Sequence, residues 1–158
     1  MTKYLGEETN FHNMKILIAY DGSDSSKRAI EVVGEMAKKE DEIILLTVIP
    51  AELLYSTFTK MLLPTIDLSS VAKESSFKER AEETLREAAR RLEDKVARIE
   101  TLVETGDPAD EILVTAKSRG CDLIVVGYKG YGKEGRFLIG SVTDKVVRHA
   151  YCSVMVVR

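Results

Sequence analysis

The sequence predicts an α/β protein: a single doubly wound domain with a five-stranded parallel sheet and helices on both faces. Three observations support this prediction. The length of 158 residues suits one domain. Short apolar runs alternate with longer segments whose apolar residues recur every three or four positions. Runs such as Glu42–Ile49 are apolar throughout instead of alternating, which is typical of strands covered on both faces.

The first half of the chain predicts a strand, a helix and a second strand. Lys15–Tyr20 is a short apolar run, and a turn follows it. Ser23 or Asp24 can cap the next helix, because either side chain can accept a hydrogen bond from an unpaired N–H of the first turn. Apolar residues continue at helical spacing through Lys39. The strand Glu42–Ile49 follows and is ended by a proline.

The second half continues the alternation and begins with the clearest helical pattern, Glu74–Ile99. A helix is expected to start at Asp107 and Pro108, since aspartate is a good N-cap and proline fits the first helical position. Gly120 is expected to close that helix. The other predicted elements are the strands Ile99–Thr105, Asp122–Val126 and Val154–Val157 and the helix Ser141–Ala150.

The net charge and the hydropathy of the chain argue against two classes of binding partner, nucleic acids and membranes. The chain has 23 basic and 26 acidic residues, so its formal net charge is −3. A dedicated nucleic-acid binder should carry a basic excess, so we expect no nucleic acid as a partner. No stretch is apolar enough to span a bilayer, so we expect no membrane association. The absence of glutamine and the many Glu, Lys and Arg residues resemble the composition of thermophilic proteins.

The N-terminal residues 1–13 lack the apolar run of a signal peptide and are interpreted as an extension to a domain spanning residues 14–158. A cytoplasmic location is therefore expected. Cys121 and Cys152 are too few for a thiolate zinc site. Each precedes a predicted strand, which leaves two alternatives: a redox pair, or two inert thiols.

A glycine pattern follows the fourth predicted strand. Gly127 and Gly130 are followed after nine residues by Gly140 and Ser141, where the last helix should begin. Glycine lets the main chain approach a phosphate closely, and a helix N-terminus presents unpaired N–H groups. The alternative is a plain loop with an ordinary helix cap. Dinucleotide-fold and P-loop motifs do not fit, because the residues that each requires are missing.

These features resemble the universal stress protein family, in its ATP-binding branch. The resemblance rests on the spacing G-x2-G-x9-G-[ST], on Asp21 at the end of the first strand, and on Val146–Ala150 before the last strand. It covers residues 14–158 and implies the strand order 3-2-1-4-5. Two departures are Tyr151-Cys152-Ser153, where the family often has Pro-Cys-Pro, and a long apolar segment at residues 50–72.

The resemblance also implies a nucleotide site at the carboxyl ends of the strands. Asp21 would accept hydrogen bonds from the ribose; the alternative is a turn residue that caps its own loop. Main-chain groups near Val48 would contact adenine. Amides of the last helix would bind phosphates, whose charge basic side chains would offset. The implied cofactor-binding residues are Ala19, Tyr20, Asp21, Val48, Val126, Gly127, Lys129, Gly130, Arg136, Gly140, Ser141, Val142 and Thr143.

Together, these observations indicate an ATP-binding regulatory protein of the stress response, in which nucleotide occupancy acts as a switch. ATP is the expected cofactor, with AMP or ADP as alternatives and any Mg²⁺ held by the phosphates. We expect no catalytic residues and at most weak ATP hydrolysis, because no paired carboxylates accompany the glycine loop. The alternatives are a slow ATPase or adenylate-transferring enzyme, and a nucleotide-free dimeric scaffold.

Two interaction surfaces are expected. A homodimer should form through the last strand, Val154–Val157, because the family pairs there and an edge strand is otherwise unprotected. An unidentified protein partner would sense the nucleotide. The segment 50–72 is interpreted as a lid or a dimer contact, with a helical cover for the sheet and a disordered loop as alternatives.

Overall fold

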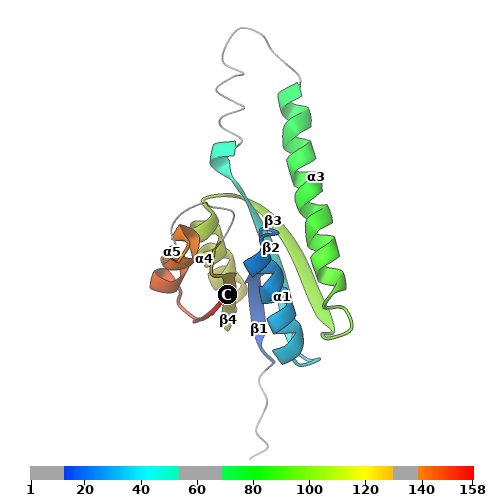
Figure 1. The fold of residues 1–158 in the computed structure, drawn as a ribbon, viewed down its shortest axis with the longest axis vertical. Coiled ribbons are helices and arrows are strands. Elements are labelled where there is room, and N and C mark those ends of the chain that lie inside the picture. The colour runs from blue at the N-terminus through cyan, green and yellow to red at the C-terminus, as the bar shows by residue number, and fades with distance from the viewer. Residues whose placement is uncertain (1–12, 54–68, 130–138) are drawn as a thin grey trace, which may run out of the picture.

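The computed structural model describes residues 13–53, 69–129 and 139–158, with side chains of α3 described from residue 75 onward. Strands and helices alternate along these residues, as the sequence predicts (Figure 1). In chain order the elements are β1 (Lys15–Ala19), α1 (Asp24–Met36), β2 (Glu42–Pro50), α3 (Ser69–Arg90), β3 (Arg98–Gly106), α4 (Pro108–Arg119), β4 (Leu123–Gly127), α5 (Ser141–His149) and β5 (Ser153–Val157).

All five strands pair in parallel, in the order β3-β2-β1-β4-β5. The predicted fold class and strand order are therefore confirmed. From β1 the chain first builds outward through β2 and β3, and then returns to place β4 and β5 on the other side. The strand order thus reverses between β1 and β4. In open sheets of this type ligands bind beyond the carboxyl ends of the strands at that reversal.

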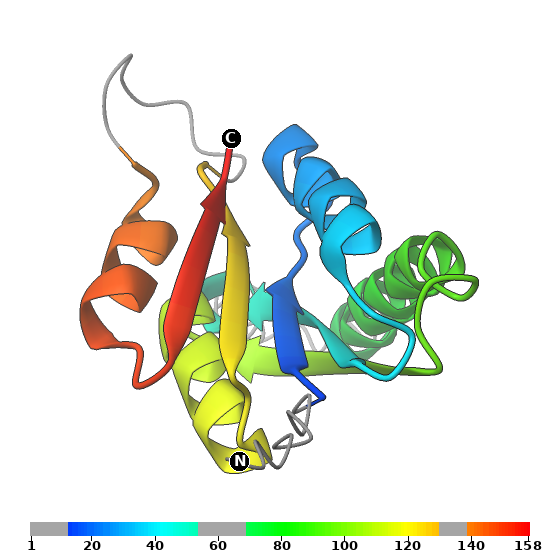
Figure 2. The same ribbon diagram turned by 90° about the horizontal axis from the view of Figure 1, so that it is seen from below.

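Helices lie on both faces of the sheet (Figure 2), and an apolar cluster lies between the sheet and the helices on each face. Successive strand residues point to opposite faces, so Ile16 and Ile18 pack under α1 and α3, whereas Leu17 packs under α4 and α5. This two-sided burial explains why the inner strands read as continuous apolar runs. The largest fully buried side chains are Ile16, Leu17, Ile18, Ile30, Ile43, Ile44, Leu45, Leu46, Leu85, Leu92, Ile124 and Val33.

The long helix ends earlier than its apolar pattern predicts. The prediction ran to Ile99, but α3 ends at Arg90, and tight turns occupy the residues up to Lys95. Leu92 and Val96 remain buried in the cluster beneath α1 and α3. The turns keep a spacing of three to four residues, with the N–H of Lys95 donating to the carbonyl of Leu92. Apolar residues therefore keep a helix-like spacing of three to four residues beyond the end of the helix.

Most other predicted boundaries agree within about two residues, and α4 agrees most closely. Asp107 caps its N-terminus by accepting a hydrogen bond from the Asp110 N–H, and Gly120 ends it in the left-handed conformation, with φ of 64°. The helix predicted through Lys39 instead ends at Met36. Of the segment 50–72, residues 54–68 lie outside the described part of the chain, as do residues 1–12 of the N-terminal extension.

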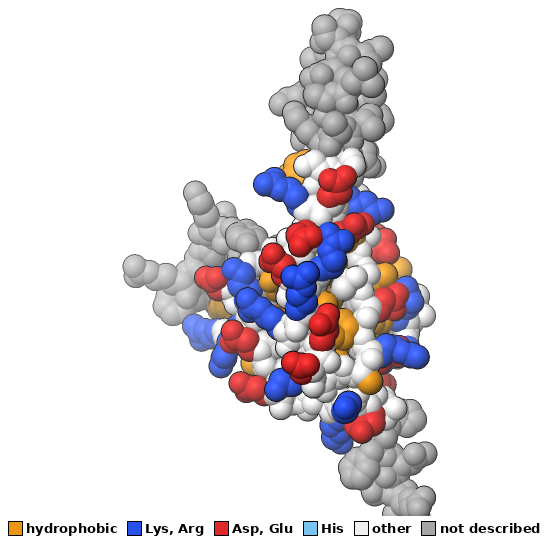
Figure 3. Space-filling view, turned by 90° about the vertical axis from the view of Figure 1, so that its right-hand side faces the viewer, with side chains coloured by type: hydrophobic (Ala, Val, Ile, Leu, Met, Phe, Trp, Pro, Cys, Tyr) orange, Lys and Arg blue, Asp and Glu red, His pale blue; other side chains and the backbone are white. Residues whose placement is uncertain are grey.

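On the face that carries α3, acidic and basic side chains are interspersed (Figure 3). Several form ion pairs within one helix, such as Arg86 with Glu83 in α3 and Arg28 with Glu31 in α1. Across the described ranges, no helix combines the length and the hydropathy that crossing a membrane would require.

Candidate functional site

The candidate site lies where β1 and β4 part at their carboxyl ends. The recorded pairing of β1 with β4 ends at Ile18 and Val125. On its other side β1 stays paired with β2 for longer, because the N–H of Tyr20 still donates to the carbonyl of Leu46 at 2.8 Å. We call the carboxyl ends of β1 and β4, together with the first turns of α1 and α5, the β1/β4 edge.

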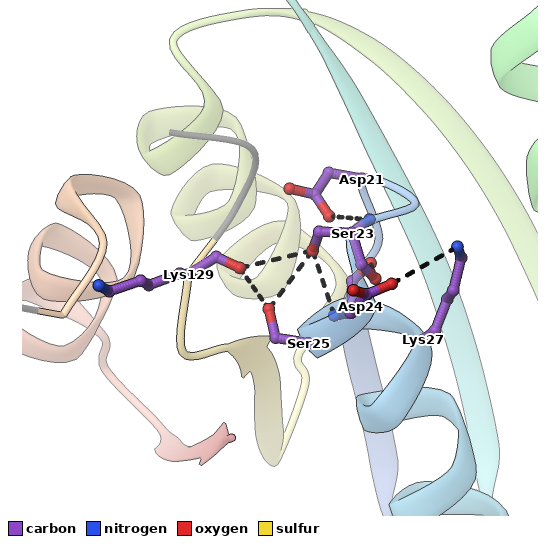
Figure 4. A network of polar contacts seen from close by, with 7 residues as sticks. Asp21, Ser23, Asp24, Ser25, Lys27 and Lys129 are labelled. Atoms are coloured by element: carbon purple, nitrogen blue, oxygen red, sulfur yellow. Dashed lines mark hydrogen bonds and ion pairs between the residues drawn. The ribbon is translucent and has the colours of Figure 1, made fainter. Parts of the chain in front are cut away.

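The turn after β1 brings the first turn of α1 to this edge. Asp21 is exposed, and its Oδ1 accepts a hydrogen bond from the N–H of Ser23 at 2.9 Å. Gly22 adopts a positive φ of 79°, and Ser23 then caps α1 by accepting from the N–H of Ser26. The turn-residue interpretation of Asp21 is therefore correct. Its second carboxylate oxygen points away from α1 (Figure 4).

Two serines of α1 hold the segment that follows β4, a contact that the sequence analysis missed. The hydroxyl of Ser25 donates to the main-chain carbonyl of Lys129, and the hydroxyl of Ser23 lies 3.4 Å from the same oxygen (Figure 4). The Lys129 side chain extends away from both serines. The clustered serines just after Asp21 were the only sequence signal available. Of these serines, the sequence analysis gave a role only to Ser23, as a possible helix cap.

Gly127 makes this approach possible. A Cβ atom at this position would lie 3.0 Å from the main-chain carbon of Ser25 and would also collide with its side chain. The resemblance assigned Gly127 to ribose and phosphates, and its missing side chain also makes room for α1. A substitution at Gly127 would therefore disturb the packing of α1 as well as the proposed site.

The first turn of α5 is fixed at the same edge by two hydrogen bonds. Gly140, the N-cap residue, donates its N–H to the carbonyl of Tyr128 at 2.9 Å. Thr143 is buried and donates its hydroxyl to the carbonyl of Gly127 at 2.7 Å. Both residues were predicted to bind a cofactor. The Gly140 N–H and the Thr143 hydroxyl donate within the protein and orient the helix.

Ser141 and Val142 begin α5 without a capping side chain, because their N-cap residue is a glycine. Ser141 is exposed and Val142 half-buried. The first N–H groups of a helix have no partner within it, and they lie at the positive end of the helix dipole. These two amides are therefore donors that α5 can offer to an anion at the β1/β4 edge.

Three of the predicted site residues are apolar and lie on the side of the sheet that α4 and α5 cover. Ala19, Val48 and Val142 are half-buried and pack against the cluster beneath α4 and α5. Two other predicted site residues are part of the core. Val126 is buried in that same cluster, and the side chain of Tyr20 is buried on the opposite face of the sheet. Neither side chain can reach a ligand at the edge, although their main chains border it.

Two predicted site residues, Gly130 and Arg136, lie outside the described residues, whereas Lys129 is described and half-buried. Among the described residues, no group of three or more His, Cys, Asp or Glu side chains could hold a metal ion. The described residues of the β1/β4 edge thus offer a ligand main-chain hydrogen-bond donors and an apolar surface.

An ion-pair cluster joins α5 to α4 next to the site. Lys145 lies 3.1 Å from a carboxylate oxygen of Asp107 and 2.8 Å from one of Asp110. The pKa of Asp107 is lowered, mainly because its carboxylate accepts the Asp110 N–H and additionally because Lys145 is near. The pKa of Lys145 is raised by its hydrogen bonds to Asp110 and Asp107. The cluster fixes α5 relative to the cap of α4.

The two cysteines lie at the opposite, amino-terminal edge of the sheet. They precede β4 and β5, which are neighbouring strands, as predicted. Burial raises the pKa of the Cys121 thiol to about 11, and burial is also the main cause of the raised pKa of Cys152. Raised values keep both thiols protonated near neutral pH, which lowers their reactivity.

Comparison with known proteins identifies relatives over nearly the whole chain. The sequence model of the universal stress protein family matches residues 12–158. Universal stress protein YxiE of Bacillus subtilis is 31% identical over 147 residues, which cover 91% of this chain and 98% of that protein. A universal stress protein of Thermus aquaticus is 38% identical over 146 residues, covering 90% of this chain and 97% of the relative.

Solved structures agree with the sequence relatives. Hypothetical protein MJ0577 superimposes with a TM-score of 0.76 at 26% identity, covering 91% of this chain and 94% of that one. A universal stress protein in complex with cAMP superimposes with a TM-score of 0.62 at 26% identity, covering 92% of this chain and 97% of that one.

Proposed function

The chain belongs to the universal stress protein family, and from this premise we propose that it is an ATP-binding regulatory protein whose nucleotide occupancy changes the surface offered to a partner. The observation that carries the proposal is the first turn of α5, which presents the Ser141 and Val142 amides at the β1/β4 edge. A structurally similar family member was solved with cAMP, an adenine nucleotide.

The geometry suggests how ATP would lie. We place the phosphates against the amides of Ser141 and Val142, where the helix dipole favours negative charge. Ribose would lie near the free carboxylate oxygen of Asp21, and adenine against Ala19 and Val48, with main-chain groups near Val48 contacting its edge. Any Mg²⁺ would be held mainly by the phosphates and water.

Two substitutions at Ser141 distinguish the contribution of its main-chain N–H from that of its hydroxyl. Ser141→Pro removes the Ser141 N–H, yet proline is well tolerated at the first helical position. The preceding Gly140 has φ −60° and ψ 148°, the extended conformation that a residue before proline prefers. Ser141→Ala is the matched control, because it removes only the hydroxyl.

We expect Ser141→Pro to raise the Kd for ATP about tenfold or more, the effect of losing one hydrogen bond to a charged group. Ser141→Ala should change it by no more than about threefold. Isothermal titration calorimetry gives both values, and thermal melts establish that the variants fold. Equal binding by Ser141→Pro and the unsubstituted chain would contradict the site.

Bound nucleotide gives an independent test. Acid extraction of the purified protein, followed by mass spectrometry, should recover ATP. Failure to recover nucleotide, together with no binding of added ATP, would instead support the nucleotide-free scaffold. Phosphate release by the purified protein that Ser141→Pro abolishes would support the slow ATPase.

We also propose that two copies associate through β5. Within the described residues β5 pairs only with β4, so its other edge is open. Val156 is 37% exposed on this strand. Pairing two such edges around a twofold axis would satisfy their main-chain groups.

A further inference from the structure

The ring of Tyr128 has two cationic side chains close to it. The Lys129 ammonium lies 5.7 Å from the ring centroid, and the Arg158 guanidinium carbon lies 5.1 Å from it. Both distances are within the range in which the negative face of an aromatic ring attracts a cation. Arg158 was not among the residues that the sequence indicated for the site.

The main chain of Tyr128 fixes these groups beside α5. Its N–H donates to the carbonyl of Val157 at 2.6 Å, and its carbonyl accepts the N–H of Gly140 at 2.9 Å. Strand alternation places Tyr128 on the same face as Val126, beneath α5. Arg158 follows Val157, which packs on the opposite face, so Arg158 also lies on the α5 side.

The charges around Tyr128 favour an anion. Asp144, the acidic residue in the first turn of α5, is bonded through both carboxylate oxygens to Arg148, at 3.0 and 2.9 Å. Among the described residues, no Asp or Glu side chain lies within ion-pair distance of Arg158. Arg158 therefore carries a positive charge that a polyanion at this edge would neutralise.

We propose that Arg158 and Lys129, positioned by the ring of Tyr128, select the triphosphate chain of ATP over AMP and cAMP. This inference rests on the proposed nucleotide site, because it assumes that the phosphates lie at the first turn of α5. The amides there can bind any phosphate, and the two cations add an attraction that grows with the charge of the phosphate chain. Arg158 therefore determines specificity without being needed for binding as such.

The test compares Kd values for ATP, AMP and cAMP, measured by calorimetry at one ionic strength. Arg158→Met keeps an unbranched, flexible side chain and removes its charge. We expect it to raise the Kd for ATP about tenfold while the Kd for AMP changes by less than about twofold. Arg158→Lys should retain most of the preference for ATP.

Arg119→Met is the matched control, because Arg119 ends α4 at the opposite edge of the sheet and pairs with Glu100. It should leave the ratio of the two Kd values unchanged. Tyr128→Phe should keep the preference for ATP, since the ring face remains, whereas Tyr128→Leu should reduce it.

The outcomes separate the two proposals. Binding of ATP and AMP by the unsubstituted chain, with both affinities lowered equally by Arg158→Met, would overturn the specificity role and leave the nucleotide site standing. An unchanged ratio in Tyr128→Leu would overturn the role of the ring. Failure of the unsubstituted chain to bind any of the three nucleotides would overturn the site and the inference together.

Discussion

Glycine at position 127 lets the main chain of β4 run directly against the first turn of α1. A Cβ atom there would meet main-chain as well as side-chain atoms of Ser25. Rotation of a side chain cannot relieve a contact with the main chain, so a larger residue would have to move α1. Since the Ser25 hydroxyl also binds the carbonyl of Lys129, the movement would reach the β1/β4 edge.

Gly127→Ala should therefore lower the free energy of unfolding by about 1–3 kcal/mol, the usual cost of overpacking. Urea denaturation followed by circular dichroism measures the change. Gly106→Ala is the control, because the three atoms nearest to a Cβ atom at Gly106 all belong to the side chain of Glu111, which can rotate away. Equal losses in both variants would contradict the explanation for Gly127.

At the scale of elements, α4 shows how a helix is fixed at both ends and also supports its neighbour. Asp107 caps its first turn, Pro108 occupies the first helical position and Gly120 closes it. The carboxylate of Asp107 also pairs with Lys145 of α5. The cap of one helix thus helps to hold the helix whose first turn forms the candidate site.

The lowered pKa of Asp107 predicts a dependence on pH. A carboxylate with a lowered pKa in the folded state stabilises the protein above its ordinary pKa of about 4, and this contribution is lost as the pH falls through the lowered value. Asp107→Ala should cost about 1 kcal/mol at pH 7. Its difference from the unsubstituted chain should shrink progressively below about pH 4.

Denaturant midpoints at several pH values measure this effect. Asp107→Asn is the control, because asparagine also caps a helix but does not titrate. The difference between the Asn and Ala variants should then stay constant with pH. A difference between the Ala variant and the unsubstituted chain that is as large at pH 2.5 as at pH 7 (on the order of 1 kcal/mol) would contradict the contribution of the ionised carboxylate.

For the whole molecule, the order of the strands puts the two proposed functions on neighbouring parts of the sheet. The reversal between β1 and β4 creates the edge where we place the nucleotide, and the same order leaves β5 at the end of the sheet. Tyr128 connects the two regions, because its N–H bonds to β5 and its carbonyl bonds to the N-cap of α5. Nucleotide binding and association through β5 are therefore expected to influence each other.

Val156→Asp tests the association. A charge on the strand edge should prevent two copies from pairing, so sedimentation velocity should show monomers where the unsubstituted chain shows dimers. Val147→Asp, on the exposed side of α5, makes the same chemical change away from the strand and should leave the dimer intact. Identical profiles for the unsubstituted chain and Val156→Asp would exclude pairing through this edge.

Much of the fold could be predicted because its signals are local. The cap at Asp107, the closing Gly120 and the apolar runs of the inner strands each depend on a few consecutive residues. The end of α3 could not be predicted in this way, since Leu92 and Val96 continue the apolar period through turns. The strand order came from the family resemblance, because alternation alone leaves several orders open.

The candidate site was predicted less completely, since contacts between distant residues define it. Asp21, Val48, Ser141 and Val142 do lie at one edge of the sheet, but Val126 and Tyr20 proved to be core residues. The donors of Gly140 and Thr143 bind within the protein. No sequence pattern indicated that Ser25 contacts Lys129 or that Arg158 lies over Tyr128.

The amino-acid sequence by itself determined the alternation of strands and helices, the buried strands and most helix caps, because these depend on side chains within a turn or two of each other. Only the tertiary structure decided which hydrogen-bond donors remain available at the β1/β4 edge and which cations lie beside them. Those contacts join β4, β5, α1 and α5, and they depend on strand order and register, which neighbouring residues in the chain do not specify.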